Sequence, residues 1–85
     1  MWRMSNRRKL NVEGFVMLVA RNVKRLRSTA GLTATEAARR GGLHLRTLQK
    51  IEAGDCNATM LSLAKVCVGL GVEMEELFTE MPPGI

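Results

Sequence analysis

The sequence has few residues that could hold a metal ion. It contains two cysteines, Cys56 and Cys67, and a single histidine, His44. A tetrahedral metal site needs about four ligands at suitable spacing, and the two cysteines do not form a CxxC pair. We therefore expect no metal and no other cofactor, and we expect two reduced, partly buried thiols.

The sequence also lacks a catalytic apparatus. A single histidine in 85 residues leaves no Ser/His/Asp set, no glycine-rich loop for a phosphate is present, and the core is too small for a substrate pocket. We expect a binding protein rather than an enzyme, with no small-molecule ligand.

Long hydrophobic runs are absent. The longest, FVMLVA at residues 15–20, is followed by Arg21 and falls well short of the roughly 20 apolar residues of a membrane span. It is also too short for a secretory signal peptide. Because 46% of the residues are hydrophobic, we expect one folded, cytoplasmic domain with no membrane partner.

Charge is unevenly distributed along the chain, whose formal net charge is +5. Residues 1–30 carry eight basic side chains and one acidic side chain, whereas residues 55–85 carry one basic and five acidic side chains. A basic N-terminal half indicates a polyanion as partner, with a merely solvated basic face as the alternative. The acidic C-terminal part should turn away from such a partner.

The apolar residues recur at helical spacing, and no segment has the alternation of a strand. The predicted fold class is all-α, a compact five-helix domain over residues 12–81. Its helices are expected at residues 13–29, 34–40, 45–53, 60–70 and 74–80. Residues 1–11 are expected to form a flexible basic arm. Three roles are open for this arm: contact with the minor groove of DNA, a general attraction for phosphates, or none. Residues 82–85 form a short tail.

Capping residues mark the ends of the predicted helices. Thr33 and Glu36 fit a capping box at the start of the second helix, and Thr59 is a good N-cap for the fourth. The glycines at 41–42 should end the second helix, one of them with a positive φ. The alanines at 37–38 allow another helix to approach closely.

The second and third predicted helices are joined by a short turn at residues 41–44. Such a turn fits two helices that cross steeply, and Leu48 and Ile51 then point inward from the third helix. The outward positions of this helix are Leu45, Arg46, Gln49 and Lys50. This outward face is suited to enter the DNA major groove, with an ordinary solvated helix face as the alternative.

Residues 22–78 resemble the lambda-repressor-like helix-turn-helix regulators, also called the Cro/CI or XRE family. The resemblance is carried by LRSTAGLT, LQKIEAG and LAKVCVGLGVEMEELF, together with the spacing of Ala38 and Gly42. GDCNATM and KVCVGLGVEMEELF also resemble the corresponding parts of restriction–modification controller proteins. The resemblance implies a transcriptional regulator that binds double-stranded DNA.

The resemblance also implies roles for single residues. The positions that contact base edges are Leu45, Arg46, Gln49 and Lys50. The positions that contact phosphates are Thr33, Thr47 and Asn57. Arg27 and Glu52 match a partly buried ion pair that joins the first helix to the end of the third, and this pair is structural.

Three positions depart from the family's pattern. Ala34 stands where a glutamine often orients groups at a phosphate. Gly41 replaces an aliphatic residue and is expected to leave a gap or loosen the turn. His44 is a poorer N-cap than the usual serine or threonine.

One domain of this size makes few base contacts, so we expect a homodimer on an inverted repeat with half-sites about one helical turn apart. The dimer interface is expected on the last two helices, at Val68, Met74, Leu77, Phe78 and Met81. A phage-type repressor or a restriction–modification controller fits these expectations. The alternative is an antitoxin-like interaction module with secondary DNA binding, whose toxin would bind the arm or the tail.

Overall fold

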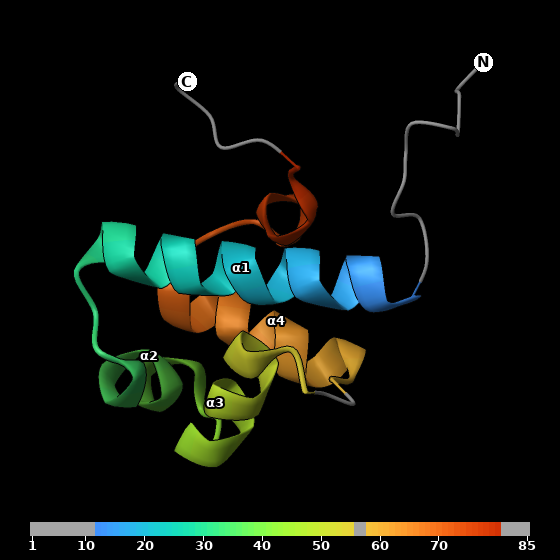
Figure 1. Ribbon diagram of the computed structural model, residues 1–85. Helices are drawn as coiled ribbons and strands as arrows, with labels where there is room; N and C mark the ends of the chain where they lie inside the picture. Colours follow the sequence, from blue (N-terminus) through green and yellow to red (C-terminus); the bar gives the residue numbers. More distant parts are fainter. Residues whose placement is uncertain (1–11, 56–57, 81–85) are drawn as a thin grey trace.

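The computed structural model describes residues 12–55 and 58–80, and within these ranges the chain is helical and contains no strand (Figure 1). The helices are α1 (Val12–Ala30), α2 (Ala34–Gly41), α3 (Leu45–Ala53), α4 (Met60–Leu70) and the 3₁₀-helix η2 (Met74–Phe78). The all-α class is confirmed, and the first four predicted helices are correct to within one residue at each end. No described helix is long and apolar enough to cross a membrane. The predicted arm and tail lie outside the described residues.

The fifth predicted helix is wrong in type and length. η2 is a 3₁₀-helix of five residues, and Thr79 after it is extended, with φ −74° and ψ 125°. The amide of Glu76 donates to the carbonyl of Glu73, three residues back, at 3.0 Å. A segment this short gains few bonds to the fourth residue back, so the tighter helix forms instead. The described chain therefore has four α-helices rather than five.

Capping groups start α2 and α4 as predicted. The hydroxyl of Thr33 accepts a hydrogen bond from the amide of Glu36 at 3.1 Å, and the carboxylate of Glu36 accepts one from the amide of Thr33 at 3.1 Å. Thr59 and Ser62 form the same reciprocal pair at α4. Gly42 ends α2 with a φ of 71°, the predicted positive value.

The α2 and α4 helices cross with their backbones in contact at two glycines, Gly41 and Gly69. A Cβ atom on Gly41 would collide with the carbonyl oxygen of Lys65, and one on Gly69 with that of Ala37. The expectation that Gly41 leaves a gap is therefore wrong, because the backbone of α4 fills that space. Ala37 and Ala38 are each 3% exposed and permit the same close approach.

The core fixes the orientation of α3. Leu48 and Ile51 pack in one cluster with Val23 of α1, Val66 of α4 and Leu77 of η2. Helix α1 contacts α3, α4 and η2, and η2 lies on the opposite side of α1 from α2 and α3 (Figure 1). One face of α3 is thereby held inside the domain and the other is left at its surface.

Candidate nucleic-acid interface

The solvent-facing surface of α3 consists of the side chains predicted for it. Leu48 and Ile51 are buried, at 1% and 3% exposed. The outward side chains are all exposed, and we call them the recognition face: Leu45, Arg46, Gln49 and Lys50. They supply two cations, an amide and an aliphatic group, which are the kinds of group that contact base edges in the major groove.

His44 stands at the N-cap of α3 without capping it through its side chain. Its backbone is extended, with φ −70° and ψ 139°, and the imidazole makes no capping hydrogen bond. The helix starts instead with a backbone bond from the amide of Leu48 to the carbonyl of His44, at 3.1 Å. As expected, His44 is a weak cap, and its ring is exposed.

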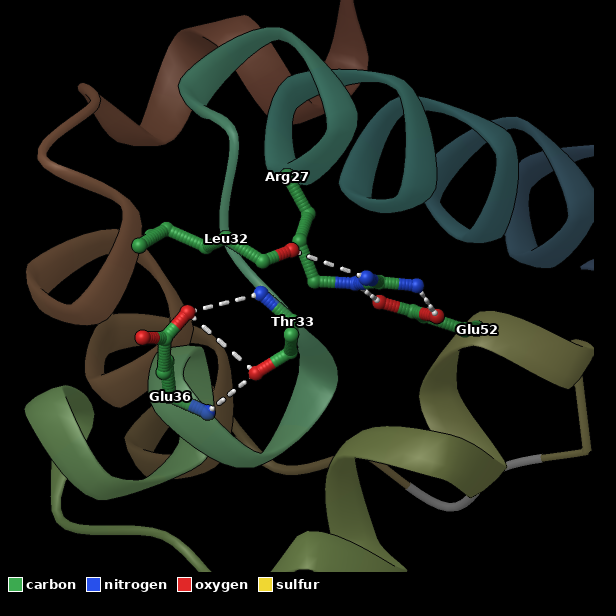
Figure 2. A network of polar contacts seen from close by, with 5 residues as sticks. All are labelled: Arg27, Leu32, Thr33, Glu36 and Glu52. Atoms are coloured by element: carbon green, nitrogen blue, oxygen red, sulfur yellow. Dashed lines mark hydrogen bonds and ion pairs between the residues drawn. The ribbon is translucent and has the colours of Figure 1, made fainter.

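Arg27 and Glu52 form a two-pronged ion pair between α1 and α3 (Figure 2). The Nε and Nη2 atoms of Arg27 donate to the two carboxylate oxygens of Glu52 at 2.7 and 2.9 Å. Its Nη1 donates to the carbonyl of Leu32 at 3.0 Å, so one guanidinium ties together α1, α3 and the connection to α2. The bond to Glu52 raises the pKa of Arg27, against the opposing effect of burial.

The start of α2 carries an anionic side chain at one of the predicted phosphate contacts. Both the amide and the hydroxyl of Thr33 are bonded to Glu36 (Figure 2). The amide, then the hydroxyl, and more weakly two arginines of α2 lower the pKa of the Glu36 carboxyl. The hydroxyl of Thr33 is therefore already engaged, and the first backbone amides of α2, those of Ala34 and Thr35, are groups of the kind that suit an anion.

Of the other two residues predicted to contact phosphates, the structure describes Thr47 but not Asn57. Thr47 is half-buried on the flank of α3, in a cleft that it shares with Thr59 and Ser62 at the start of α4. Asn57 lies outside the described residues. The cleft beside Thr47 is thus formed jointly by α3 and α4.

The residues predicted for the dimer interface differ in how far they are exposed. Leu77 is 0% exposed and belongs to the core of the single domain, so its assignment to a dimer interface is wrong. Met74 packs against the same core. Val68 and Phe78 are 70% and 45% exposed, and Met81 lies outside the described residues. The η2 helix has only five residues, so its sequence pattern does not show which of its side chains pack on α1.

An apolar groove that the sequence did not reveal lies between α1, α4 and η2. Its volume is about 380 Å³, and it is lined by Phe15, Val16, Val19, Ile51, Ala58, Leu63 and Phe78. Phe15 shares the apolar stripe of α1 with the buried Val23, yet it is 48% exposed. Periodicity identifies the apolar face of a helix but not the point along it where the covering elements end.

A buried amide that the sequence did not reveal holds η2 on α1. Asn22 is 3% exposed, and its Nδ2 donates to the carbonyls of Leu77 and Thr79, both at 2.8 Å. Its Oδ1 accepts from Arg25 at 3.1 Å. Asn22 stands between Arg21 and Val23 in the sequence, and no local pattern distinguishes it from a solvated polar residue.

The acidic, histidine and cysteine side chains of the described ranges form no cluster of three or more that could hold a metal ion. Cys67 is free and buried. Burial, with smaller contributions from Glu73 and Glu76, raises the pKa of its thiol, as is usual for an unreactive core cysteine.

Comparison with known proteins gives matches over most of the chain. Residues 23–77 match the helix-turn-helix family. The uncharacterized HTH-type transcriptional regulator y4dJ of Sinorhizobium fredii (strain NBRC 101917 / NGR234) is 39% identical over 62 residues, which cover 73% of this chain and 80% of that protein.

Solved structures of two restriction–modification controller proteins have a similar fold. C.AhdI from Aeromonas hydrophila superposes with a TM-score of 0.71 at 25% identity, over 74% of this chain and 96% of the other. A point variant of C.Esp1396I superposes with a TM-score of 0.69 at 26% identity, over 75% of this chain and 81% of the other.

The chain therefore belongs to the helix-turn-helix family of DNA-binding transcriptional regulators. The family that the sequence resembled is confirmed.

Proposed function

We propose that this chain regulates transcription by placing α3 in the major groove of a specific operator. The observation that carries the proposal is the division of α3 into two faces. Leu48 and Ile51 lock one face into the core, and every side chain of the recognition face is exposed. A short helix that is rigidly held and presents hydrogen-bonding groups outward is the arrangement that helix-turn-helix proteins use to contact bases.

The recognition face assigns distinct chemistry to each position. Arg46 would donate two hydrogen bonds to O6 and N7 of a guanine, and Gln49 would bond an adenine or a bridging water. Lys50 donates to an acceptor on a base edge, and Leu45 contacts a thymine methyl group.

The contacts to the DNA backbone position α3 rather than specify the sequence. We assign them to the amides at the start of α2 next to Thr33, to Thr47 and to Asn57. The pair between Arg27 and Glu52 is structural, because the carboxylate already engages two of the guanidinium nitrogens. Removing one partner of such a pair would leave a poorly solvated charge.

The operator-bound form is a homodimer on an inverted repeat. One domain contacts few base pairs, and a second copy would double the recognition surface with half-sites about one helical turn apart. The apolar groove supplies the surface for a second copy, because Phe15 and Phe78 at its rim are about half exposed. Exposed aromatic side chains around a groove are typical of the centre of a protein interface.

Control of a restriction–modification operon is the context that the similar structures support. The chain superposes on 96% and 81% of two restriction–modification controller chains. Genes for a methyltransferase and an endonuclease beside this one would support the assignment, whereas a neighbouring toxin gene would support an antitoxin.

Selection of binding sites from a random duplex library tests the proposal. We expect enrichment of an inverted repeat at near-physiological salt. Binding that depends on salt but enriches no sequence would overturn a role as a specific regulator, because it would show phosphate attraction alone.

Substitution of Arg46 by alanine tests the recognition face. We expect Arg46→Ala to weaken binding of the selected site by about 1–3 kcal/mol and to relax the preference at one base pair. Arg21→Ala, an exposed arginine on α1, is the control and should keep the full sequence preference. Equal weakening on all duplexes would instead make Arg46 a phosphate contact. Competition with single-base variants of the site measures both effects.

A further inference from the structure

A second groove, of about 390 Å³, runs between the α2–α3 turn and α4. Residues with basic side chains line it from three elements: Arg39 of α2, His44 of the turn and Lys65 of α4. Thr47 of α3 lines it as well. We call it the basic groove.

The basic groove has the electrostatics of an anion site. Among the described residues no aspartate or glutamate lines it. Within the same described part of the chain, the side chain of neither Arg39 nor Lys65 has a hydrogen-bond or ion-pair partner. Glu36, whose carboxylate interacts weakly with Arg39, lies outside this lining. Two cations that share a groove lined by no carboxylate repel each other, and an anion between them would remove that repulsion.

The fold itself brings the two cations to one groove. Gly41 and Gly69 let the backbones of α2 and α4 touch, so that side chains projecting from the edges of both helices line a common space. Arg39 lies two residues before one end of this contact, and Lys65 contributes its carbonyl to the contact itself.

The basic groove continues toward the recognition face. It shares Thr47, Thr59 and Ser62 with a neighbouring cleft. That cleft extends along α3 to Lys50, a member of the recognition face, and to Asp55. The two clefts therefore adjoin, and together they extend from Lys50 past Thr47 to Arg39 and Lys65.

We propose that the basic groove binds the phosphodiester backbone of the DNA flanking the base pairs contacted by α3, with Arg39 and Lys65 as its ligands. This inference rests on the proposed DNA-binding function and extends it, because it adds contacts outside the recognition face. It predicts an operator whose affinity depends on backbone beyond the specified bases.

The dependence of affinity on salt tests this inference. Binding of the selected duplex is measured over a range of salt for the wild type and for Arg39→Gln combined with Lys65→Gln. Removing one contact to a phosphate lowers the magnitude of the slope of log K against log salt by about 0.9. For two such contacts we expect the slope to fall by about 2. Glutamine retains much of each aliphatic stem and removes the charge.

Two further variants show whether a change in the slope comes from lost contacts of Arg39 and Lys65 with DNA, from the lower net charge or from a folding defect. Arg21→Gln combined with Lys24→Gln removes the same charge from the exposed face of α1, and we expect the slope to change by less than half as much. Arg39→Lys combined with Lys65→Arg keeps both cations and should keep the wild-type slope. Thermal unfolding of all three variants checks that each of them remains folded.

Ethylation interference then identifies the phosphates concerned. Ethylation of a flanking phosphate should weaken binding of the wild type and have no effect on the variant that lacks both cations. Titration with inorganic phosphate, followed by the amide signals of Thr47 and Lys65, distinguishes a backbone site from a site for a free anion.

Each result decides a separate point. An unchanged salt slope for the variant lacking both cations would overturn the basic groove while leaving the proposed function in place, since the wild type would still select an operator. Equal losses in the two charge-matched variants, or saturation by inorganic phosphate without interference in the flank, would also overturn it. Failure of the wild type to select any sequence would overturn the proposed function itself.

Discussion

Glu36 shows how one side chain serves the local fold and limits the function of its neighbour. Its carboxylate accepts from the amide of Thr33 and its own amide donates to the Thr33 hydroxyl. This pair fixes where α2 begins, and it also places a negative charge where a DNA phosphate is expected to approach. The cap and a phosphate contact at this end of α2 would therefore depend on the same groups.

The capping carboxylate makes part of the stability depend on pH. Because the pKa of Glu36 is lowered below its ordinary value of 4.5, its contribution is fully present above that value and is lost as pH falls through the folded-state pKa. We expect Glu36→Gln to lower the midpoint of urea unfolding at pH 7, with a difference that shrinks below pH 4.5 and disappears in more acidic solution. A difference of the same size at every pH would show that the ionised carboxylate is not responsible.

At the scale of elements, the crossing with α4 fixes how closely α2, the first helix of the helix-turn-helix, packs on the domain. The backbones touch at Gly41 and Gly69, and a Cβ atom on Gly69 would also lie 3.0 Å from the amide nitrogen of Gly41. Both neighbours are backbone atoms, so no side-chain rotation could relieve the collision.

Gly69→Ala should therefore destabilise the protein, although alanine is ordinarily the better helix former by about 0.5–1 kcal/mol. We expect the free energy of unfolding to fall by about 1–3 kcal/mol, as for an overpacked core. Val68→Ala, at the neighbouring exposed position of α4, should change it by less than about 0.5 kcal/mol. Denaturant unfolding measures both, and a Gly69→Ala protein as stable as the wild type would contradict the crossing.

Elements that depend on local rules were predictable from the sequence. The Thr33–Glu36 cap, a left-handed glycine at either 41 or 42 and the division of α3 into inward and outward residues all follow from spacing. Gly41 was misjudged because its partner, Gly69, lies 28 residues away, and no local pattern shows that contact. The same holds for Asn22, which reaches carbonyls beyond residue 76.

At the scale of the whole molecule, charge and apolar surface are separated. The η2 helix lies across α1 from α3 (Figure 1), and Glu73 just before it and Glu75 within it are exposed. A DNA duplex at the recognition face would therefore avoid the acidic end of the chain. The apolar groove, bordered by α1, α4 and η2, is a further distinct surface, which the sequence could not locate because residues from separate elements line it.

If the dimer forms through the apolar groove, a charged side chain placed there should dissociate it. Phe15→Asp places a carboxylate in the proposed interface twice per dimer, and we expect the dissociation constant to rise at least about 100-fold. Val68→Asp, which alters an apolar side chain that is more exposed and does not line the groove, is the control and should leave the dimer intact. Sedimentation over a range of concentrations measures both. Dissociation by Val68→Asp alone would place the interface on the outer surface of α4.

The attachment of η2 has a consequence for the lifetime of the protein. This short helix is held by the two bonds of Asn22 and by the burial of Leu77, while it also carries Phe78 to the rim of the apolar groove. Detachment of this segment is a local opening that costs less than global unfolding, and pairing with a second copy would suppress it. Monomers would then be degraded faster than dimers, so that proteolysis itself would sharpen the response of the regulator to its own concentration.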